Sequence, residues 1–193
     1  MSTSPALPSL PVLPAPSGWL RRWQHLLPAS GRVLDLACGS GRHLRWLQAQ
    51  GFVVTGVDRD AAALASLKAV AEVVVADIES EPWPLPGRQF DGVVVTNYLW
   101  RPLWPQILDS LAPRGVLLCE TFADGQQHIG RPTRPEFLLR PGELLSLCRG
   151  LRVLAFEDGF ETQPPRCVQR IVAVAEPTTT PSDARHRLPL HGS

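Results

Sequence analysis

The sequence predicts an α/β fold built on a doubly wound, mostly parallel sheet. Short apolar runs alternate with segments of helical periodicity from residue 32 to residue 121. The runs are almost continuously apolar, which indicates strands covered by helices on both faces. The last two runs, at 151–157 and 167–175, are too close for a crossover helix and should pair antiparallel.

Each expected element follows from local composition. Strand-sized runs rich in Val, Leu, Ile and Phe occur at residues 32–37, 52–57, 71–76, 90–96, 115–121, 151–157 and 167–175. Helical spacing of apolar residues occurs at 18–28, 41–50, 61–69, 103–111 and 141–149. Residues 122–140 show neither pattern, so we expect a long loop there.

We expect one domain at residues 17–176 between two disordered tails. Five of the 20 prolines fall within residues 1–16, a composition that builds neither a helix nor an inner strand. Residues 177–193 are polar and rich in turn formers. The N-terminus lacks a basic segment followed by an apolar one, and the apolar runs are strand-sized, so we expect a cytoplasmic protein without a membrane span.

Net charge and cysteine spacing limit the classes of ligand that the sequence favours. The net charge is +1, so no overall charge favours nucleic acid or an anionic membrane. The four cysteines are widely spaced and form no CxxC pair, which predicts reduced thiols and no metal site.

The strongest motif is the run VLDLACGSGRH at residues 33–43. It reads as a strand end, a glycine-rich turn and a helix start, whose free N–H groups can face a ligand. An acid within the strand repels a pyrophosphate but suits a cationic ligand, so the motif predicts S-adenosylmethionine (SAM) rather than a dinucleotide. The candidate cofactor-binding residues of this run are Asp35, Ala37, Cys38, Gly39, Ser40 and Gly41.

Two further acids end the next two expected strands. Asp58, followed by Arg59, can accept hydrogen bonds from ribose hydroxyls, and Asp77 can accept one from an adenine amino group beside Ile78. Leu44 replaces the third glycine of the dinucleotide-binding pattern GxGxxG. An isolated Asp at a strand end is more often a turn former or helix cap, so the argument depends on the ordered set of acids.

These motifs together resemble the class I SAM-dependent methyltransferases over about residues 31–175. The resemblance implies a seven-stranded, Rossmann-like sheet with an antiparallel last strand. A weaker resemblance, carried by ETF, GRP and FLLRPGEL after the fifth run, points to the small-molecule branch that includes tellurite-resistance-type methyltransferases.

The segment after the fourth expected strand holds the substrate-side candidates. In this family such residues lie next to the methyl group, which implies catalytic roles for Asn97, Tyr98 and Arg101, with Asn97 also holding the cofactor. The sequence TNYL keeps an Asn but lacks the prolines of an NPPY motif, which argues against nucleic-acid amino groups as acceptors. His43 is expected at the surface or as a cap.

The expected loop carries His128, Arg131, Arg134 and Arg140, with Glu120 before it. The arginines either recognise an anion or belong to a solvated loop. The predicted function is methyl transfer to a small molecule, with the acceptor and the oligomeric state left open. The alternatives are a non-catalytic SAM-binding partner subunit and a dinucleotide-binding oxidoreductase.

Overall fold

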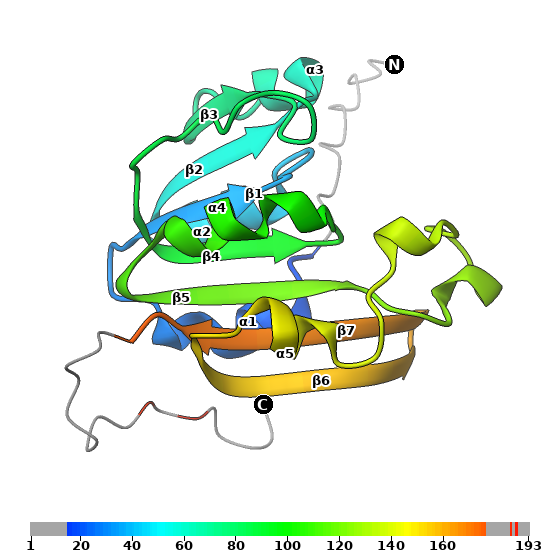
Figure 1. Ribbon diagram of the computed structural model, residues 1–193. Helices are drawn as coiled ribbons and strands as arrows, with labels where there is room; N and C mark the ends of the chain where they lie inside the picture. Colours follow the sequence, from blue (N-terminus) through cyan, green and yellow to red (C-terminus); the bar gives the residue numbers. More distant parts are fainter. Residues whose placement is uncertain (1–14, 177–185, 187, 189–193) are drawn as a thin grey trace, which may run out of the picture.

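The computed structural model describes residues 15–176 together with residues 186 and 188. The tails expected at 1–16 and 177–193 therefore lie almost entirely outside the described residues. The described chain forms one seven-stranded sheet in the order β3-β2-β1-β4-β5-β7-β6 (Figure 1). This sheet confirms the predicted fold class.

The strands β1 to β5 run parallel to one another, and β7 runs antiparallel to both β5 and β6. Strand order reverses beside β1, where chain crossovers pass to opposite faces and leave room for a ligand. The strands are β1 (Arg32–Leu36), β2 (Val53–Asp58), β3 (Glu72–Val75), β4 (Phe90–Thr96), β5 (Leu111–Phe122), β6 (Arg152–Thr162) and β7 (Pro165–Val174).

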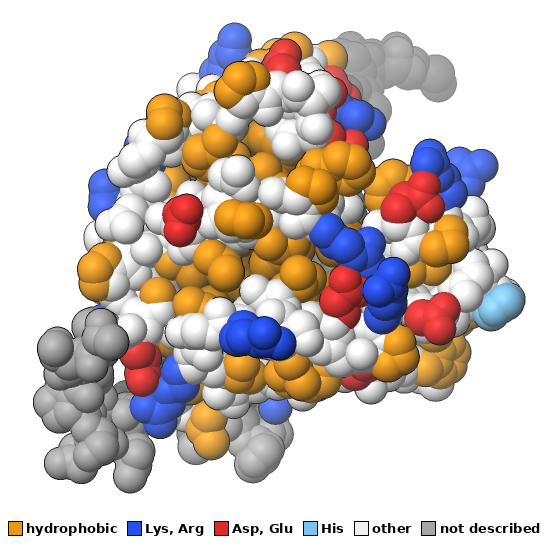
Figure 2. Space-filling view, in the orientation of Figure 1, with side chains coloured by type: hydrophobic (Ala, Val, Ile, Leu, Met, Phe, Trp, Pro, Cys, Tyr) orange, Lys and Arg blue, Asp and Glu red, His pale blue; other side chains and the backbone are white. Residues whose placement is uncertain are grey.

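Helices cover both faces, as the apolar strands require. One core cluster packs α1, α2 and α3 on one face, and the other packs α4 and α5 on the opposite face. Because α4 and α5 are short, hydrophobic side chains remain visible at the centre of the face shown in Figure 2. The helices are α1 (Gly18–Trp23), α2 (Arg42–Ala49), α3 (Ala61–Ala65), α4 (Trp104–Asp109) and α5 (Glu143–Leu147), with 3-10 turns at Gln24–Leu26, Arg101–Leu103, Gln126–His128 and Pro135–Phe137.

The C-terminal hairpin is longer than the sequence suggested. The sequence placed the two strands at residues 151–157 and 167–175, but β6 and β7 stay paired up to Thr162↔Pro165. The ladder between β6 and β7 continues past the end of β5, and it satisfies the backbone groups of these residues. The loop at 122–140 is also partly structured, with a bridge between Ala123 and Leu139.

No helix in the described part of the chain is long and apolar enough to cross a membrane. The four cysteines are unpaired, and all but Cys167 are buried.

Candidate active site

A tight turn joins β1 to α2 and uses the left-handed backbone region three times. Ala37, Gly39 and Gly41 have φ angles of 54°, 53° and 79°. A Cβ at Gly39 would meet no atom within 4 Å, whereas a Cβ at Gly41 would come within 2.5 Å of a methyl group of Leu67. Gly41 therefore serves both the backbone and the packing, and Gly39 leaves open space beside the turn.

Gly41→Ala is expected to lower the free energy of unfolding by about 2–3 kcal/mol, from left-handed strain plus crowding of Leu67. Urea titration measures the loss. The control is Gly51→Ala, because Gly51 has a φ of 91° but open space around its Cβ position. Gly51→Ala should cost only the strain, about 1 kcal/mol. Equal losses in the two variants would contradict the packing role of Gly41.

Asp58, at the end of β2, fixes the shape of this turn. Its Oδ2 accepts a hydrogen bond from the Gly39 N–H at 2.7 Å, and its Oδ1 accepts one from the Asp60 N–H at 2.9 Å. The parallel pairing of β1 with β2 brings the two strand ends side by side. Each carboxylate oxygen retains a lone pair, so Asp58 can hold the turn and a ligand hydroxyl together.

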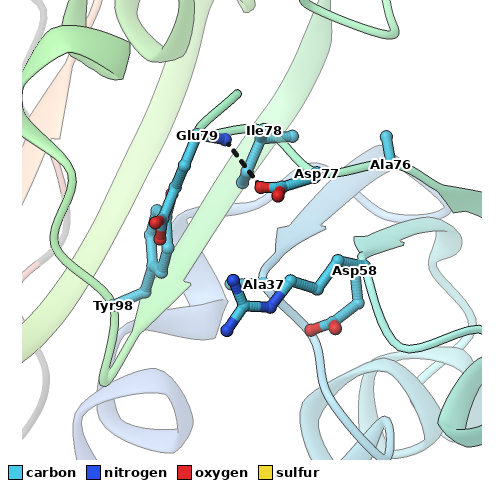
Figure 3. Close-up of a pocket in the computed structure, with 8 residues that line it drawn as sticks. Ala37, Asp58, Ala76, Asp77, Ile78, Glu79 and Tyr98 are labelled. Carbon is cyan, nitrogen blue, oxygen red and sulfur yellow. Dashed lines mark hydrogen bonds between the residues drawn. The ribbon is translucent and has the colours of Figure 1, made fainter. Parts of the chain in front are cut away.

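A cavity of about 270 Å³ opens at the carboxyl ends of β1 to β4 (Figure 3). Asp77 lies on its wall, where its Oδ1 accepts a hydrogen bond from the Glu79 N–H at 3.1 Å. This bond and the Ser80 side chain lower the pKa of Asp77, which keeps the carboxylate ionised. We call this space the cofactor cavity; it is lined by Ala37, Asp58, Arg59, Ala76, Asp77, Ile78, Glu79 and Tyr98.

A second cavity, of about 620 Å³, shares Glu79 and Tyr98 with the first. Asn97 lines it with a φ of 55°, and the Asn97 N–H donates to the Glu120 carbonyl at 2.8 Å. We call this space the acceptor cavity; it is lined by Glu79, Asn97, Tyr98, Leu99, Thr121, Phe122, Arg131, Pro132, Thr133, Arg134 and Phe137.

Tyr98 stands in the wall between the two cavities, with Glu79 beside it (Figure 3). Its hydroxyl oxygen is buried and makes no hydrogen bond of ordinary geometry. Burial and the negative charges of Glu79 and Asp77 raise the pKa of Tyr98 above its usual range. The phenol therefore stays protonated, and the Tyr98 side chain forms part of the lining of both cavities.

Asp35 lies beneath the turn and lines neither cavity, and its contact with a cationic ligand stays a prediction. Its side chain is fully buried, and neither oxygen has a hydrogen-bond partner of ordinary geometry. Burial raises the pKa of Asp35 to about 7, and the Leu44 amide and the charge of Arg42 offset only part of that rise. Cys38, Ser40 and the two glycines likewise shape the turn without lining the cofactor cavity.

Residues 33–115 match a family described as a methyltransferase domain. The fold is similar to that of a SAM-dependent methyltransferase from Methanosarcina mazei, with a TM-score of 0.64 and 18% identity over 79% of this chain and 96% of that one. Residues 33–115 therefore carry a methyltransferase domain, and the fold of the described chain is that of SAM-dependent methyltransferases. The cofactor that this domain and fold imply is SAM, so the comparisons do not support the dinucleotide-binding oxidoreductase.

Other proteins similar to this chain carry names that point to different activities. TehB from Haemophilus influenzae has a TM-score of 0.62 and 17% identity over 76% of this chain and 58% of that one. The putative methyltransferase YqeM of Bacillus subtilis is 31% identical over 54% of this chain and 48% of that protein. The tRNA U34 carboxymethyltransferase of Cronobacter sakazakii is 27% identical over 88% of this chain and 54% of that protein. The chain thus spans about half the length of these curated relatives.

Arg101 does not line either cavity of the methyltransferase. Its guanidinium donates to both carboxylate oxygens of Glu143, at 2.6 and 2.8 Å, and to the carbonyls of Glu136 and Leu138 at 2.7 and 2.8 Å. These bonds use four of the five guanidinium N–H donors, so Arg101 holds the loop that walls the acceptor cavity. A catalytic role for Arg101 stays a prediction.

The sequence suggested a surface or cap position for His43; the structure buries it, which rules out the surface position. Its Nε2 accepts a hydrogen bond from the Ser17 N–H at 3.2 Å, so the neutral ring carries its proton on Nδ1 and donates to Thr96 Oγ1 at 2.9 Å. Burial lowers the pKa of His43 to about 4, which keeps the ring neutral at physiological pH. His43 therefore ties the start of α1 to the end of β4.

The sequence did not single out several residues that line the methyltransferase's cavities. Glu79 follows Asp77 by two positions, and that spacing was the only available signal for its place between the two cavities. The acceptor-cavity residues after β5 belong to an irregular loop, so no periodicity identified them; they are Thr121, Phe122, Pro132, Thr133 and Phe137. Of the expected loop residues, Arg131 and Arg134 reach this cavity, whereas Arg140 and His128 do not line it.

Proposed function

We propose that this chain transfers a methyl group from SAM to a small molecule held in the acceptor cavity. The observation that carries the proposal is the shared wall of the two cavities, formed by Tyr98 and Glu79. When bound, SAM supplies an electrophilic methyl group on a sulfonium, and displacement needs the acceptor in line with it. Adjacent cavities with a common wall suit that arrangement.

The lining of the cofactor cavity fits an adenosyl ligand. Asp58 and Asp77 offer hydrogen-bond acceptors to hydroxyl and amino groups, while Ile78 and Ala76 offer apolar contacts to a base. The open space at the Gly39 Cβ position allows a ligand to approach the turn. These residues would hold the cofactor.

The chain's own residues have separate tasks at the common wall. The Tyr98 ring can position the acceptor by contact, and the Glu79 carboxylate can accept a proton from the acceptor. Asn97 contributes to the acceptor side. The mechanism needs alignment more than a strong base, because the sulfonium already activates the methyl group.

Asp58→Ala is expected to weaken binding of S-adenosylhomocysteine at least tenfold, or about 1.5–3 kcal/mol, because a charged acceptor is lost. Calorimetry measures the affinity. The control is Asp60→Ala, which removes the cap that accepts from the Ala62 and Ala63 N–H groups but does not line the cavity. Asp60→Ala should reduce stability by about 1 kcal/mol and leave the affinity unchanged. Equal affinity in wild type and Asp58→Ala would contradict the assigned cofactor site.

An RNA acceptor is the competing candidate, because some curated relatives are tRNA U34 carboxymethyltransferases. The purified chain should be incubated with labelled SAM and either a small-molecule extract or bulk tRNA. The proposal expects label in the small-molecule fraction only. Label in tRNA alone would replace the acceptor class, and no label in either arm despite SAM binding would support a non-catalytic partner subunit.

A further inference from the structure

The acceptor cavity carries opposite charges on different walls. Among the residues that line this cavity, the acidic one is Glu79, which belongs to the wall shared with the cofactor cavity. Arg131 and Arg134 come from the loop after β5 and line the acceptor cavity alone. An anionic group on an acceptor is therefore repelled by the cofactor-side wall and attracted to the loop.

The two arginines are not equivalent. The Arg134 guanidinium donates to Glu136 Oε1 at 2.8 Å and lies 5.2 Å from the centre of the Phe137 ring, so it already has partners. The Arg131 guanidinium has no hydrogen bond or ion pair with any residue that the structure describes. Arg131 is thus the cation that a ligand can engage.

The backbone that carries Arg131 is anchored. Gln126, which is 4% exposed, donates from Nε2 to the Arg131 carbonyl at 3.1 Å. The Oε1 of Gln126 accepts from the Cys167 N–H of β7 at 2.9 Å. The loop is therefore tied to the sheet next to Arg131, which lowers the entropy lost when its side chain binds an anion.

Apart from Asn97, Thr121 and Thr133, the rest of the lining of the acceptor cavity is apolar. Leu99, Phe122, Pro132 and Phe137 line it together with the ring of Tyr98. We infer that the methyl acceptor has an apolar body and a carboxylate, and that Arg131 binds this carboxylate in a bidentate manner. Its other end then faces Tyr98 and Glu79. This inference rests on the proposed function, since it assigns the acceptor of the same site.

The test uses the full chain saturated with S-adenosylhomocysteine and matched probe pairs. The probes are phenylacetate, phenylpropionate and indole-acetate, each compared with its carboxamide by calorimetry. On wild type, at least one acid should bind about tenfold or more tightly than its amide, as expected for a charge-assisted pair. If no acid is preferred over its amide, the inference is overturned.

Arg131→Gln should abolish the preference for the acid and leave amide binding unchanged. The control is Arg140→Gln, which removes an exposed arginine of the same loop that lies outside the cavity. Arg140→Gln should keep the preference; a preference that survives in Arg131→Gln would assign the anion to another group and overturn the inference.

Binding of S-adenosylhomocysteine separates this inference from the proposed function. Arg131 does not line the cofactor cavity, so Arg131→Gln should bind this ligand as wild type does. Failure of wild type to bind it would defeat the proposed function. Normal binding without discrimination between acids and amides would defeat only the carboxylate assignment.

Discussion

Replacing Glu120 with Gln is expected to lower the free energy of unfolding by about 3–5 kcal/mol, since it removes the acid from a buried ion-pair network. Glu120 is 1% exposed. Its carboxylate accepts from Arg170, from Arg166 at 3.3 Å and from the Ser17 hydroxyl at 3.1 Å. Without it, the buried Arg170 and the partly buried Arg166 lose a compensating charge. Urea unfolding of the purified variant measures the effect.

The matched control is Glu157→Gln, which removes an acid of the same network whose side chain is 42% exposed. Its pairs with Arg22 and Arg170 are both 3.1 Å long, but solvent screens them, so the cost should stay below about 1 kcal/mol. Arg170→Gln should also cost less in the Glu120→Gln background than alone. Similar losses for Glu120→Gln and Glu157→Gln would show that burial does not govern this network.

The second large effect concerns Asp35 and pH. The pKa of Asp35 rises from 3.8 to about 7 in the folded protein. Between these values the folded state keeps a proton that the unfolded chain releases, so this group reduces stability as the pH rises from about 4 to 7. Below that range Asp35 does not change the free energy of unfolding. Above pH 7 it lowers that free energy by its full amount, on the order of 4 kcal/mol.

Asp35→Asn should therefore remove most of this pH-dependent loss. Unfolding free energies of the ligand-free protein at pH 5 and pH 8 give the measurement, and the quantity compared is the difference between the two pH values. Asp109→Asn, which changes an exposed carboxylate at the end of α4, is the control and should keep the wild-type difference. If Asp35→Asn keeps it as well, Asp35 does not titrate as its burial implies.

Sequence patterns predicted the sheet because each buried parallel strand is a short apolar run that can be recognised locally. Continuous apolar runs mark them, and the glycine turn and the acids at strand ends gave the cofactor cavity, including Asp58 and Asp77. The pattern did not place Asp35. A carboxylate inside a strand looks the same in sequence whether it faces a ligand or the underside of a helix.

The acceptor cavity was harder to predict because its walls depend on contacts distant in sequence. Arg101 appeared to be a substrate-side residue from its position after β4. Its partner Glu143 lies 42 residues later, and only the folded loop brings the two together. The partners of His43 are also distant in sequence, because it forms hydrogen bonds with Ser17 and Thr96.

The position of β7 between β5 and β6 affects how the protein is made. While the ribosome synthesises residues 123–164, β5 has its outer edge unpaired, since β6 pairs only with β7 in the described sheet. An unpaired strand edge is a template for association between chains. A nascent chain stopped before β7 should therefore need chaperone protection that the finished chain does not.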